Sequence, residues 1–233
     1  MKAMVLAAGR GERLRPMTDM TPKPLVPVGG KPLISHHLEA LARAGIRDVV
    51  INLSWLADRV RTALGDGRHF GVHITYSDEG ATALETGGGI FNALQLLGSE
   101  PFLVVNGDIW TDIDFAALAS RIETAADWRT NLSVLAHLVL VPNPPQHPGG
   151  DFGLDGDRVL ERESGRFTYS GVGLYRPELF AGCTPGRFPL APLLKRAIAA
   201  GRLRGELHHG DWCDAGTPER LAALDERVRA RQA

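Results

Sequence analysis

The chain is short of cysteine, of long apolar runs and of net charge, and each shortage excludes a class of protein. Its 233 residues carry 26 basic against 27 acidic side chains, so no general attraction to nucleic acid is expected. Two cysteines, Cys183 and Cys213, provide neither a disulfide framework nor a metal-binding pattern. The first apolar run ends before Gly9, which is too short for a signal peptide or for a membrane-spanning helix of roughly 20 residues. We therefore expect a cytoplasmic protein that binds neither nucleic acid nor membranes.

Lysine is also scarce, since the chain has only four, at positions 2, 23, 31 and 195. Lys23 lies between Pro22 and Pro24, and proline restricts both its own backbone and that of the residue before it. A lysine held this stiffly is expected to have a defined position and a specific task.

A glycine-containing turn precedes that lysine. The apolar residues 3–8 are followed by Gly9 and Gly11, a pattern typical of a strand that ends in a tight turn. Glycines let backbone N–H groups converge on an anion, and Arg13 and Arg15 add positive charge to the same region. The segment therefore predicts a phosphate-binding loop.

Two common phosphate-binding loops do not fit this segment. A P-loop requires Gly-Lys-Ser/Thr at the start of a helix, whereas Glu12 and Arg13 follow Gly11. The dinucleotide fingerprint requires a third glycine, where this chain has Leu14, and four prolines between residues 16 and 27 forbid a continuous helix until about residue 32. We expect a long, extended, cationic loop that wraps a triphosphate, and a nicotinamide oxidoreductase is nearly excluded.

Apolar runs alternate with helical patterns in the first half of the chain. Strands are expected near residues 3–7, 48–53, 72–76 and 102–106, and helices near 32–44, 57–64, 87–98 and 114–122. Strands and turns follow over about 131–176, and helices return near 190–200 and 217–230. Strands separated by helices pair in parallel. We therefore predict a single α/β domain with a Rossmann-like, mostly parallel sheet flanked by helices and a smaller antiparallel lid over the site.

Three motifs follow predicted parallel strands, at 8–15, 77–89 and 106–108. Ligands bind at the carboxyl ends of strands in open parallel sheets. A carboxylate there, such as Asp108, suits Mg²⁺, and the alternative is an aspartate that only shapes the turn. Asp214 is the second candidate, and it remains free if Thr217 caps the helix that follows.

The N-terminal pattern resembles the signature of the sugar-1-phosphate nucleotidylyltransferases. It runs Leu6-Ala7-Ala8-Gly9-x-Gly11-x-Arg13-Leu14-x-Pro16 and continues as Pro22-Lys23-Pro24-Leu25. The resemblance extends to about Leu224. Val141-Pro142-Asn143-Pro144, together with Gly150-Asp151-Phe152-Gly153, resembles the branch that acts on N-acetylmuramic acid α-1-phosphate in bacterial cell-wall recycling.

This resemblance implies transfer of a uridylyl group from UTP to a sugar 1-phosphate, with pyrophosphate released. It implies Lys23, Arg13 and Asp108 as catalytic residues and one Mg²⁺ held by Asp108 and Asp214. The implied nucleotide-binding residues are Leu6, Ala8, Gly9, Gly11, Glu12, Arg13, Lys23, Glu85, Thr86, Asn106 and Gly107. Relatives have a glycine where Glu85 stands, so its side chain either contacts the base or ribose or points away. Ser77, Asp78 and Glu79 are weaker candidates.

The resemblance also implies a sugar-binding part over residues 131–233, after a nucleotide-binding part over 1–130. The implied sugar contacts are Asn143, Gly153, Glu163, Ser170 and Gly171. Glu161 competes with Glu163, and Tyr169 replaces an asparagine common in relatives. The lactyl carboxylate of a muramic sugar needs a cationic or N–H partner, and the arginine candidates are Arg162, Arg187, Arg202 and Arg204. Since the chain lacks the C-terminal β-helix of many relatives, we expect a monomer.

Three alternatives stay open. A mannose-1-phosphate guanylyltransferase or a glucose-1-phosphate thymidylyl- or uridylyltransferase would use the same motif, and a non-catalytic nucleotide-sugar sensor would use much of it. His36 and His37 in the first long helix, and His208 and His209 in a late strand, are expected to be structural or exposed. The arginines at 220, 227, 229 and 231 are expected to form a solvated helix face.

Overall fold

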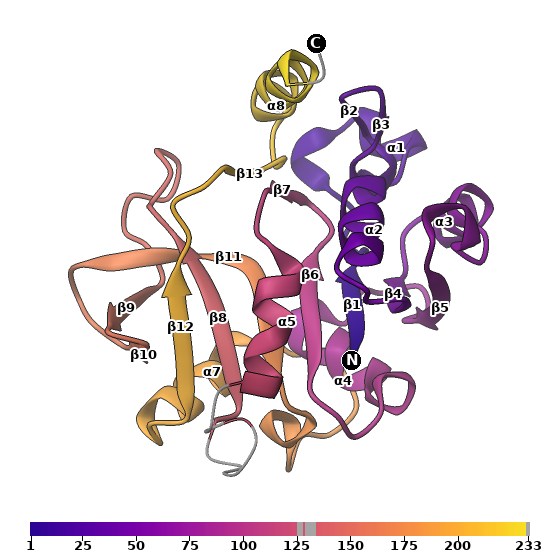
Figure 1. The fold of residues 1–233 in the computed structure, drawn as a ribbon. Coiled ribbons are helices and arrows are strands. Elements are labelled where there is room, and N and C mark those ends of the chain that lie inside the picture. The colour runs from indigo at the N-terminus through magenta and orange to yellow at the C-terminus, as the bar shows by residue number, and fades with distance from the viewer. Residues whose placement is uncertain (125–127, 129–133, 232–233) are drawn as a thin grey trace.

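The computed structural model describes residues 1–124, 128 and 134–231 and is built around one nine-stranded sheet (Figure 1). The strand order is β5-β4-β1-β6-β11-β8-β12-β10-β9. These strands are β1 (Lys2–Leu6), β4 (Asp48–Leu53), β5 (His73–Asp78), β6 (Phe102–Asn106), β8 (Ala136–Val141), β9 (Phe152–Asp155), β10 (Arg158–Leu160), β11 (Arg166–Tyr175) and β12 (Leu203–Leu207). The long helices are α2 (Leu33–Arg43), α3 (Ala57–Leu64), α4 (Glu85–Leu97), α5 (Phe115–Thr124), α7 (Ala191–Ala199) and α8 (Pro218–Ala230).

The predicted parallel sheet forms one side of this assembly. Strand β1 pairs in parallel with β4 and β6, and β4 pairs in parallel with β5. The strands predicted after residue 131 join the same sheet, because β11 pairs antiparallel with both β6 and β8. The α/β fold class and its strand and helix positions are thus confirmed, and the antiparallel part is continuous with the parallel part.

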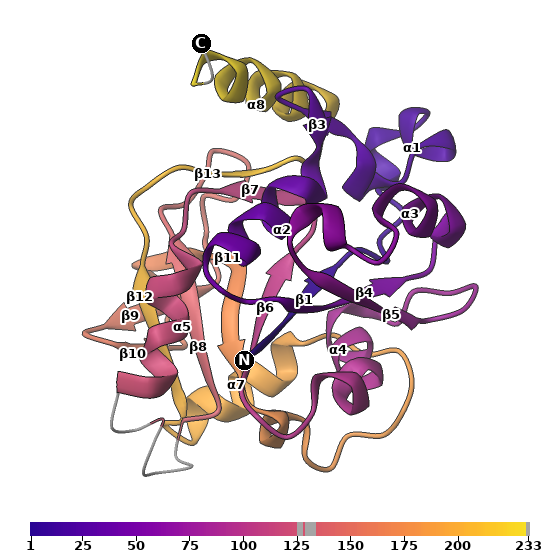
Figure 2. The same cartoon turned by 45° about the vertical axis from the view of Figure 1, so that its right-hand side comes forward.

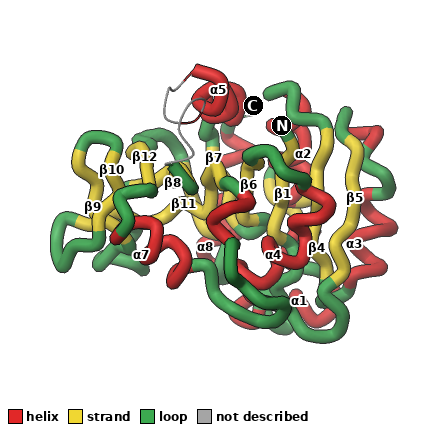
Figure 3. The backbone as a smooth tube through the Cα atoms, turned by 90° about the horizontal axis from the view of Figure 1, so that it is seen from below, coloured by secondary structure: helices red, strands yellow, loops and turns green. Residues whose placement is uncertain are grey.

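Successive residues of each strand point to opposite faces of the sheet, so they contribute to two hydrophobic cores, one on each face. In β1, Ala3 and Val5 pack with α2, α3 and α5, whereas Met4 packs with α4 and α7. The view along the strands places α2 and α5 on one side of the sheet and α4 and α7 on the other (Figure 3). Because successive side chains of a strand point to opposite faces, only every second residue near its end can face a ligand bound on one side.

The segment between β1 and α2 contains short helical turns, so the prediction of an extended loop was wrong in detail. It forms η1 (Glu12–Leu14), α1 (Met17–Met20) and η2 (Lys23–Leu25), followed by the hairpin of β2 (Pro27–Val28) and β3 (Lys31–Pro32). None of these turns exceeds four residues, as expected where prolines interrupt the helical hydrogen bonds.

The C-terminal segment returns to this loop. Strand β13 (Trp212–Asp214) pairs antiparallel with β7 (Ile109–Thr111), and α8 then lies beside β2 and β3 (Figures 1 and 2). A separate hydrophobic cluster joins the loop to α8. It contains Leu14, Val26, Val28, Leu33, Trp110, Ala215, Leu221, Leu224 and Val228. Among the described helices, none has the length and apolar character needed to span a membrane.

Candidate active site

A cavity of about 350 Å³ opens at the carboxyl ends of β1, β4 and β6. This is the edge of the sheet at which ligands bind in open α/β folds. The lining residues are Leu6, Ala7, Ala8, Gly9, Gly11, Glu12, Arg13, Lys23, Pro24, Asn52, Glu79, Ala83, Glu85, Thr86, Asn106, Gly107, Asp108 and Gly216. All eleven predicted nucleotide-binding residues are among them.

Asn52 also lines the cavity, although it was not among the predicted site residues. Its Oδ1 accepts a hydrogen bond from the N–H of Ala7 (2.7 Å), and its Nδ2 donates to Glu79 Oε1 (2.6 Å). Glu79 Oε2 in turn accepts from the N–H of Leu84 (2.7 Å). Asn52 and Glu79 therefore tie the first loop to the segment that begins α4. The available signal was a polar residue near the carboxyl end of a buried strand.

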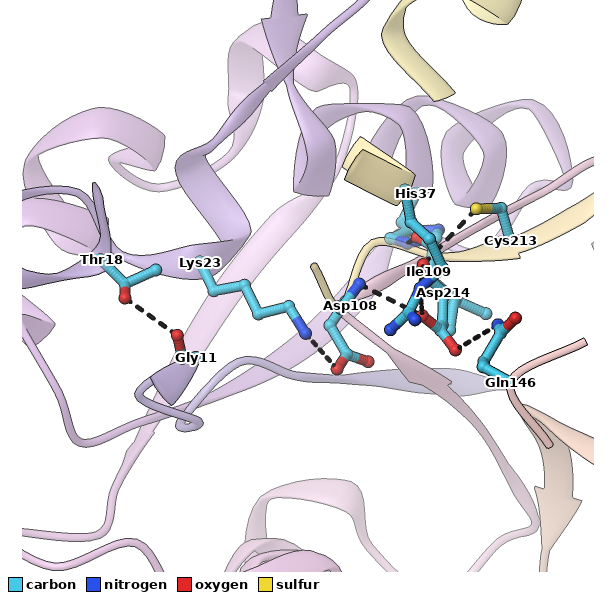
Figure 4. Close-up of polar contacts among 11 residues, drawn as sticks. Gly11, Thr18, Lys23, His37, Asp108, Ile109, Gln146, Cys213 and Asp214 are labelled. Carbon is cyan, nitrogen blue, oxygen red and sulfur yellow. Dashed lines mark hydrogen bonds and ion pairs between the residues drawn. The ribbon is translucent and has the colours of Figure 1, made fainter. Parts of the chain in front are cut away.

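Lys23 points across the cavity to Asp108 (Figure 4). Its Nζ lies 2.6 Å from Asp108 Oδ2, and the lysine side chain is only 9% exposed. Gly11 makes room for this lysine, because a methyl group on Gly11 would lie 3.1 Å from Lys23 Cβ. Gly11 also has a φ of 70°, which glycine adopts without strain. The glycine pattern therefore shapes the path of the lysine side chain.

Asp108 directly precedes β7 and Asp214 ends the paired strand β13, so the two lie close together although they are far apart in the sequence. Asp214 pairs with Ile109, and the N–H of Ala215 donates to the carbonyl of Asp108 (2.9 Å). Among the described residues, no group of three or more His, Cys, Asp and Glu side chains could hold a metal ion. Two carboxylates beside this cavity nonetheless fit Mg²⁺, which typically takes one or two carboxylates and completes its shell with phosphates and water.

Asp214 is not free, so that prediction was wrong. Arg220 Nε lies 2.6 Å from Asp214 Oδ1, and Gln146 Nε2 donates to Oδ2 (3.1 Å). The predicted cap holds as well, because Thr217 Oγ1 accepts from the N–H of Arg220 (3.4 Å). Gln146 comes from the loop between β8 and β9, so this contact brings that loop to Asp214 (Figure 4).

The predicted solvated face of α8 is also only partly correct. The guanidinium groups of Arg227 and Arg231 lie near the Trp110 ring and pair with Asp211, whose side chain is 13% exposed. Only Arg229 has the expected surface pairing, with Asp225 at 2.7 Å. The prediction of a solvated face failed for Arg227 and Arg231 because their acidic partner, Asp211, lies outside the helix.

The positive charge of the loop is unevenly distributed. Arg15 pairs with Asp19 (2.8 Å) and Glu12 (3.6 Å), so its charge is compensated at the surface. Arg10 stacks over Trp55, with its guanidinium carbon 4.2 Å from the ring centroid. Arg13 lines the cavity and forms no ion pair within the described residues. The loop therefore directs Arg13 and Lys23 to the cavity, and the expected contribution of Arg15 was wrong.

Glu85 begins α4 in a left-handed conformation, with a φ of 61°. Such a conformation costs a non-glycine residue of order 1 kcal/mol, which explains the glycine of the relatives. Its carboxylate lies at the cavity and is 3.0 Å from Arg187 Nη2. Arg187 is thus engaged beside the predicted nucleotide-binding residues.

The predicted sugar-binding residues do not line this cavity, and several of their polar atoms are engaged in the protein. Asn143 Nδ2 donates to the carbonyls of Pro148 and Arg166, and its Oδ1 accepts from Thr168. Ser170 Oγ donates to the carbonyl of Val139 (2.7 Å). Their role as sugar contacts stays a prediction.

The other members of this set lie in different surroundings. Gly171 adjoins the cavity wall, because a methyl group on it would lie 2.7 Å from Asn106. Gly153 faces the Arg162 side chain, and Glu163 is exposed. The competing Glu161 pairs with Lys195 at 2.6 Å.

The histidines have structural partners. His37 Nε2 lies 2.8 Å from the carbonyl of Ile109, and complete burial lowers the pKa of His37 to about 4. His208 contacts Asp112 (2.7 Å), but it follows β12 rather than lying in a strand as predicted. His37 is thus a neutral imidazole that donates a hydrogen bond to the carbonyl of Ile109. This bond holds the start of β7, directly after Asp108.

Comparison with known proteins agrees with this arrangement. Residues 2–145 match the nucleotidyl transferase family, and the chain belongs to this family. It is 52% identical to the N-acetylmuramate alpha-1-phosphate uridylyltransferase of Neisseria meningitidis serogroup B, over 95% of each chain. The enzyme of the same name from Caulobacter vibrioides is 38% identical, over 97% of this chain and 96% of that one.

Two other relatives bear on the alternatives and on the fold. The mannose-1-phosphate guanyltransferase of Aspergillus oryzae is 31% identical, over 94% of this chain and 62% of that one. The structure of a putative glucose-1-phosphate thymidylyltransferase from Bacillus anthracis superposes with a TM-score of 0.86 at 24% identity, covering 98% of this chain and 95% of that one. The latter likeness concerns the fold alone.

Proposed function

We propose that the chain transfers a uridylyl group from UTP to N-acetylmuramic acid α-1-phosphate, giving the UDP-sugar and pyrophosphate. The observation that carries this proposal is that Lys23 and Asp108 line one cavity and that Asp214, on the strand paired with β7, lies next to Asp108. The likeness to two N-acetylmuramate α-1-phosphate uridylyltransferases over nearly the whole chain supports the choice of substrates.

The reaction is an in-line displacement. A phosphate oxygen of the sugar 1-phosphate attacks the α-phosphorus of UTP, the bond to the β-phosphate oxygen breaks, and pyrophosphate leaves. Such transfers depend on positioning and on compensation of charge rather than on a protein nucleophile. Arg13 and the N–H groups around Gly9 and Gly11 hold the β- and γ-phosphates, and Lys23 stabilises charge near the α-phosphate.

Asp108 and Asp214 would hold one Mg²⁺ between the two substrates. Mg²⁺ when bound compensates the mutual repulsion of the phosphates. In its absence Lys23 compensates Asp108 and Arg220 compensates Asp214. These cations fix the orientation of both carboxylates at the proposed metal site.

The two substrates are bound by successive parts of the chain. Residues 1–130 bind the nucleotide and residues 131–233 contribute the sugar contacts within one domain, which we propose acts as a monomer in the cytoplasm as part of peptidoglycan recycling. The pairing of β13 with β7 supports this arrangement, because it brings Asp214 of the second part next to Asp108 of the first.

A panel of sugar 1-phosphates against the four nucleoside triphosphates, with Mg²⁺ and a pyrophosphate readout, tests the proposal. We expect turnover to be greatest with UTP and N-acetylmuramic acid α-1-phosphate. Greater turnover with GTP and mannose 1-phosphate would favour the guanylyltransferase alternative. Absence of pyrophosphate from every combination, with nucleotide sugars still bound, would indicate a sensor.

A further inference from the structure

Arg220 has a fixed position at the edge of the cavity. It lies in the first turn of α8, where Thr217 caps the helix and Pro218 occupies the first helical position. Side chains in a helix lean toward its N-terminus, which here directs Arg220 back to β13. Its Nε contacts both the carboxylate (2.6 Å) and the carbonyl (3.2 Å) of Asp214, and the side chain is 21% exposed.

One end of this guanidinium has no acceptor. Arg220 Nη2 is buried and makes no hydrogen bond with the described residues. An unsatisfied buried donor is unfavourable, and more so if it is charged. The carboxylate of Asp214 therefore holds Arg220 from one side and leaves its other side available for a ligand.

A second guanidinium approaches the same point. A methyl group on Gly216 would lie 2.4 Å from Arg220 Nη2 and 2.8 Å from Arg13 Nη2. Gly216 itself lines the cavity, as does Arg13. Two cations thus meet beside one glycine, and Asp214 compensates only one of them. This arrangement is unfavourable when empty and favourable when an anion lies between the two groups.

We propose that Arg220 and Arg13 together bind the pyrophosphate group of the nucleotide, as the β- and γ-phosphates of the substrate and as the product. Planar guanidinium groups form paired hydrogen bonds with phosphate oxygens. Gly216 lets the two guanidinium groups approach each other at the cavity wall, because no Cβ stands between them. The inference rests on the proposed function for the identity of the phosphate donor, whereas the paired arginines are independent of the sugar.

Binding of inorganic pyrophosphate in EDTA, measured by calorimetry, tests this directly without the metal. We expect Arg220→Ala to weaken pyrophosphate binding at least about tenfold, corresponding to the loss of a charge-assisted hydrogen bond, and Arg220→Lys to recover part of it. Arg229→Ala is the matched control, because Arg229 lies on the same helix and pairs with an aspartate at the surface. It should leave the affinity unchanged.

A second variant guards against a folding defect in Arg220→Ala. Gly216→Ala adds a methyl group against the ends of the Arg220, Arg13 and Asp214 side chains and against no backbone atom among its three nearest neighbours, so the protein should melt at nearly the wild-type temperature but bind pyrophosphate several-fold more weakly. In the reverse reaction, Arg220→Ala should raise KM for pyrophosphate at least about tenfold while KM for the nucleotide sugar changes little.

Three results would overturn the inference. They are unchanged pyrophosphate affinity in folded Arg220→Ala, a change confined to the sugar 1-phosphate, and wild-type protein that binds UTP but not pyrophosphate. Failure of the proposed function looks different, because the pyrophosphate affinity would still depend on Arg220 while no sugar 1-phosphate supported turnover.

Discussion

The two parts of the chain hold their predicted site residues very differently. In residues 1–130, the eleven predicted nucleotide-binding residues line one cavity. In residues 131–233, the five predicted sugar-binding residues lie outside it, and the polar side chains of Asn143 and Ser170 bond to neighbouring strands and loops. The cavity lies at the ends of adjacent parallel strands, whereas Asn143 and Ser170 form hydrogen bonds within the antiparallel part of the sheet.

Removal of the Lys23 ammonium group should have the largest effect on turnover. We expect Lys23→Ala to reduce kcat by about two to three orders of magnitude, as for other preorganised groups that stabilise developing charge. The fold should persist, because the partner Asp108 is 44% exposed and can be solvated. Lys31→Ala is the control, since Lys31 forms a surface pair with Glu39. Unchanged turnover in Lys23→Ala would remove this lysine from the site.

Acid should destabilise the two parts in different pH ranges. Burial holds the pKa of His37 at about 4 in the fold against 6.5 in the unfolded chain. The contribution of neutral His37 to the free energy of unfolding is complete above pH 6.5. It decreases as the pH falls toward 4, because the unfolded state then binds more protons than the folded state. The free energy of unfolding should fall by about 2 kcal/mol between pH 7.5 and 5.

The second part should respond at lower pH. Hydrogen bonding to His137, together with Arg121, lowers the pKa of Glu206, so that stabilisation is lost only as the pH falls through and below the carboxyl range. Urea unfolding from pH 7.5 to 3.5 separates these effects. His37→Gln should flatten the upper range alone, and an unchanged slope there would assign the loss to another group.

Ser170→Ala tests whether the second part is organised by its own hydrogen bonds. The hydroxyl of Ser170 donates to Val139 and accepts from the N–H of Val172 (3.1 Å). Loss of these buried bonds should lower the free energy of unfolding by about 1–2 kcal/mol, with KM for the sugar 1-phosphate within about twofold of wild type. A large rise in KM without destabilisation would show that the hydroxyl meets the sugar, and the comparison between the two parts would weaken.

The smallest effect is expected at Glu85. Glu85→Gly relieves a left-handed φ but adds freedom to the unfolded chain, so the free energy of unfolding should rise by less than about 1 kcal/mol. KM for UTP should increase several-fold if the carboxylate contacts the base or ribose. Arg187→Ala is the control, because it removes the ion pair without changing the backbone. Equal KM values in all three proteins would exclude Glu85 from nucleotide binding.

The sequence predicted the central strands and helices because their apolar periodicity is local. The sequence also predicted that Lys23 and Asp108 lie at the same edge of the sheet, because each follows a strand of the parallel sheet. It could not predict the contact of Arg220 with Asp214, because that contact depends on where α8 packs. Gln146 escaped notice for the same reason, as its loop reaches Asp214 only after β8 and β13 are in place.

The packing of α8 on the N-terminal loop has a consequence for synthesis. Leu14 and Val28 are made about 200 residues before Leu224 and Val228, with which they share a cluster. At about 5–20 residues per second, the loop waits roughly 10–40 s for the helix that covers it. Nascent chains on the ribosome should therefore be inactive until translation has passed Val228.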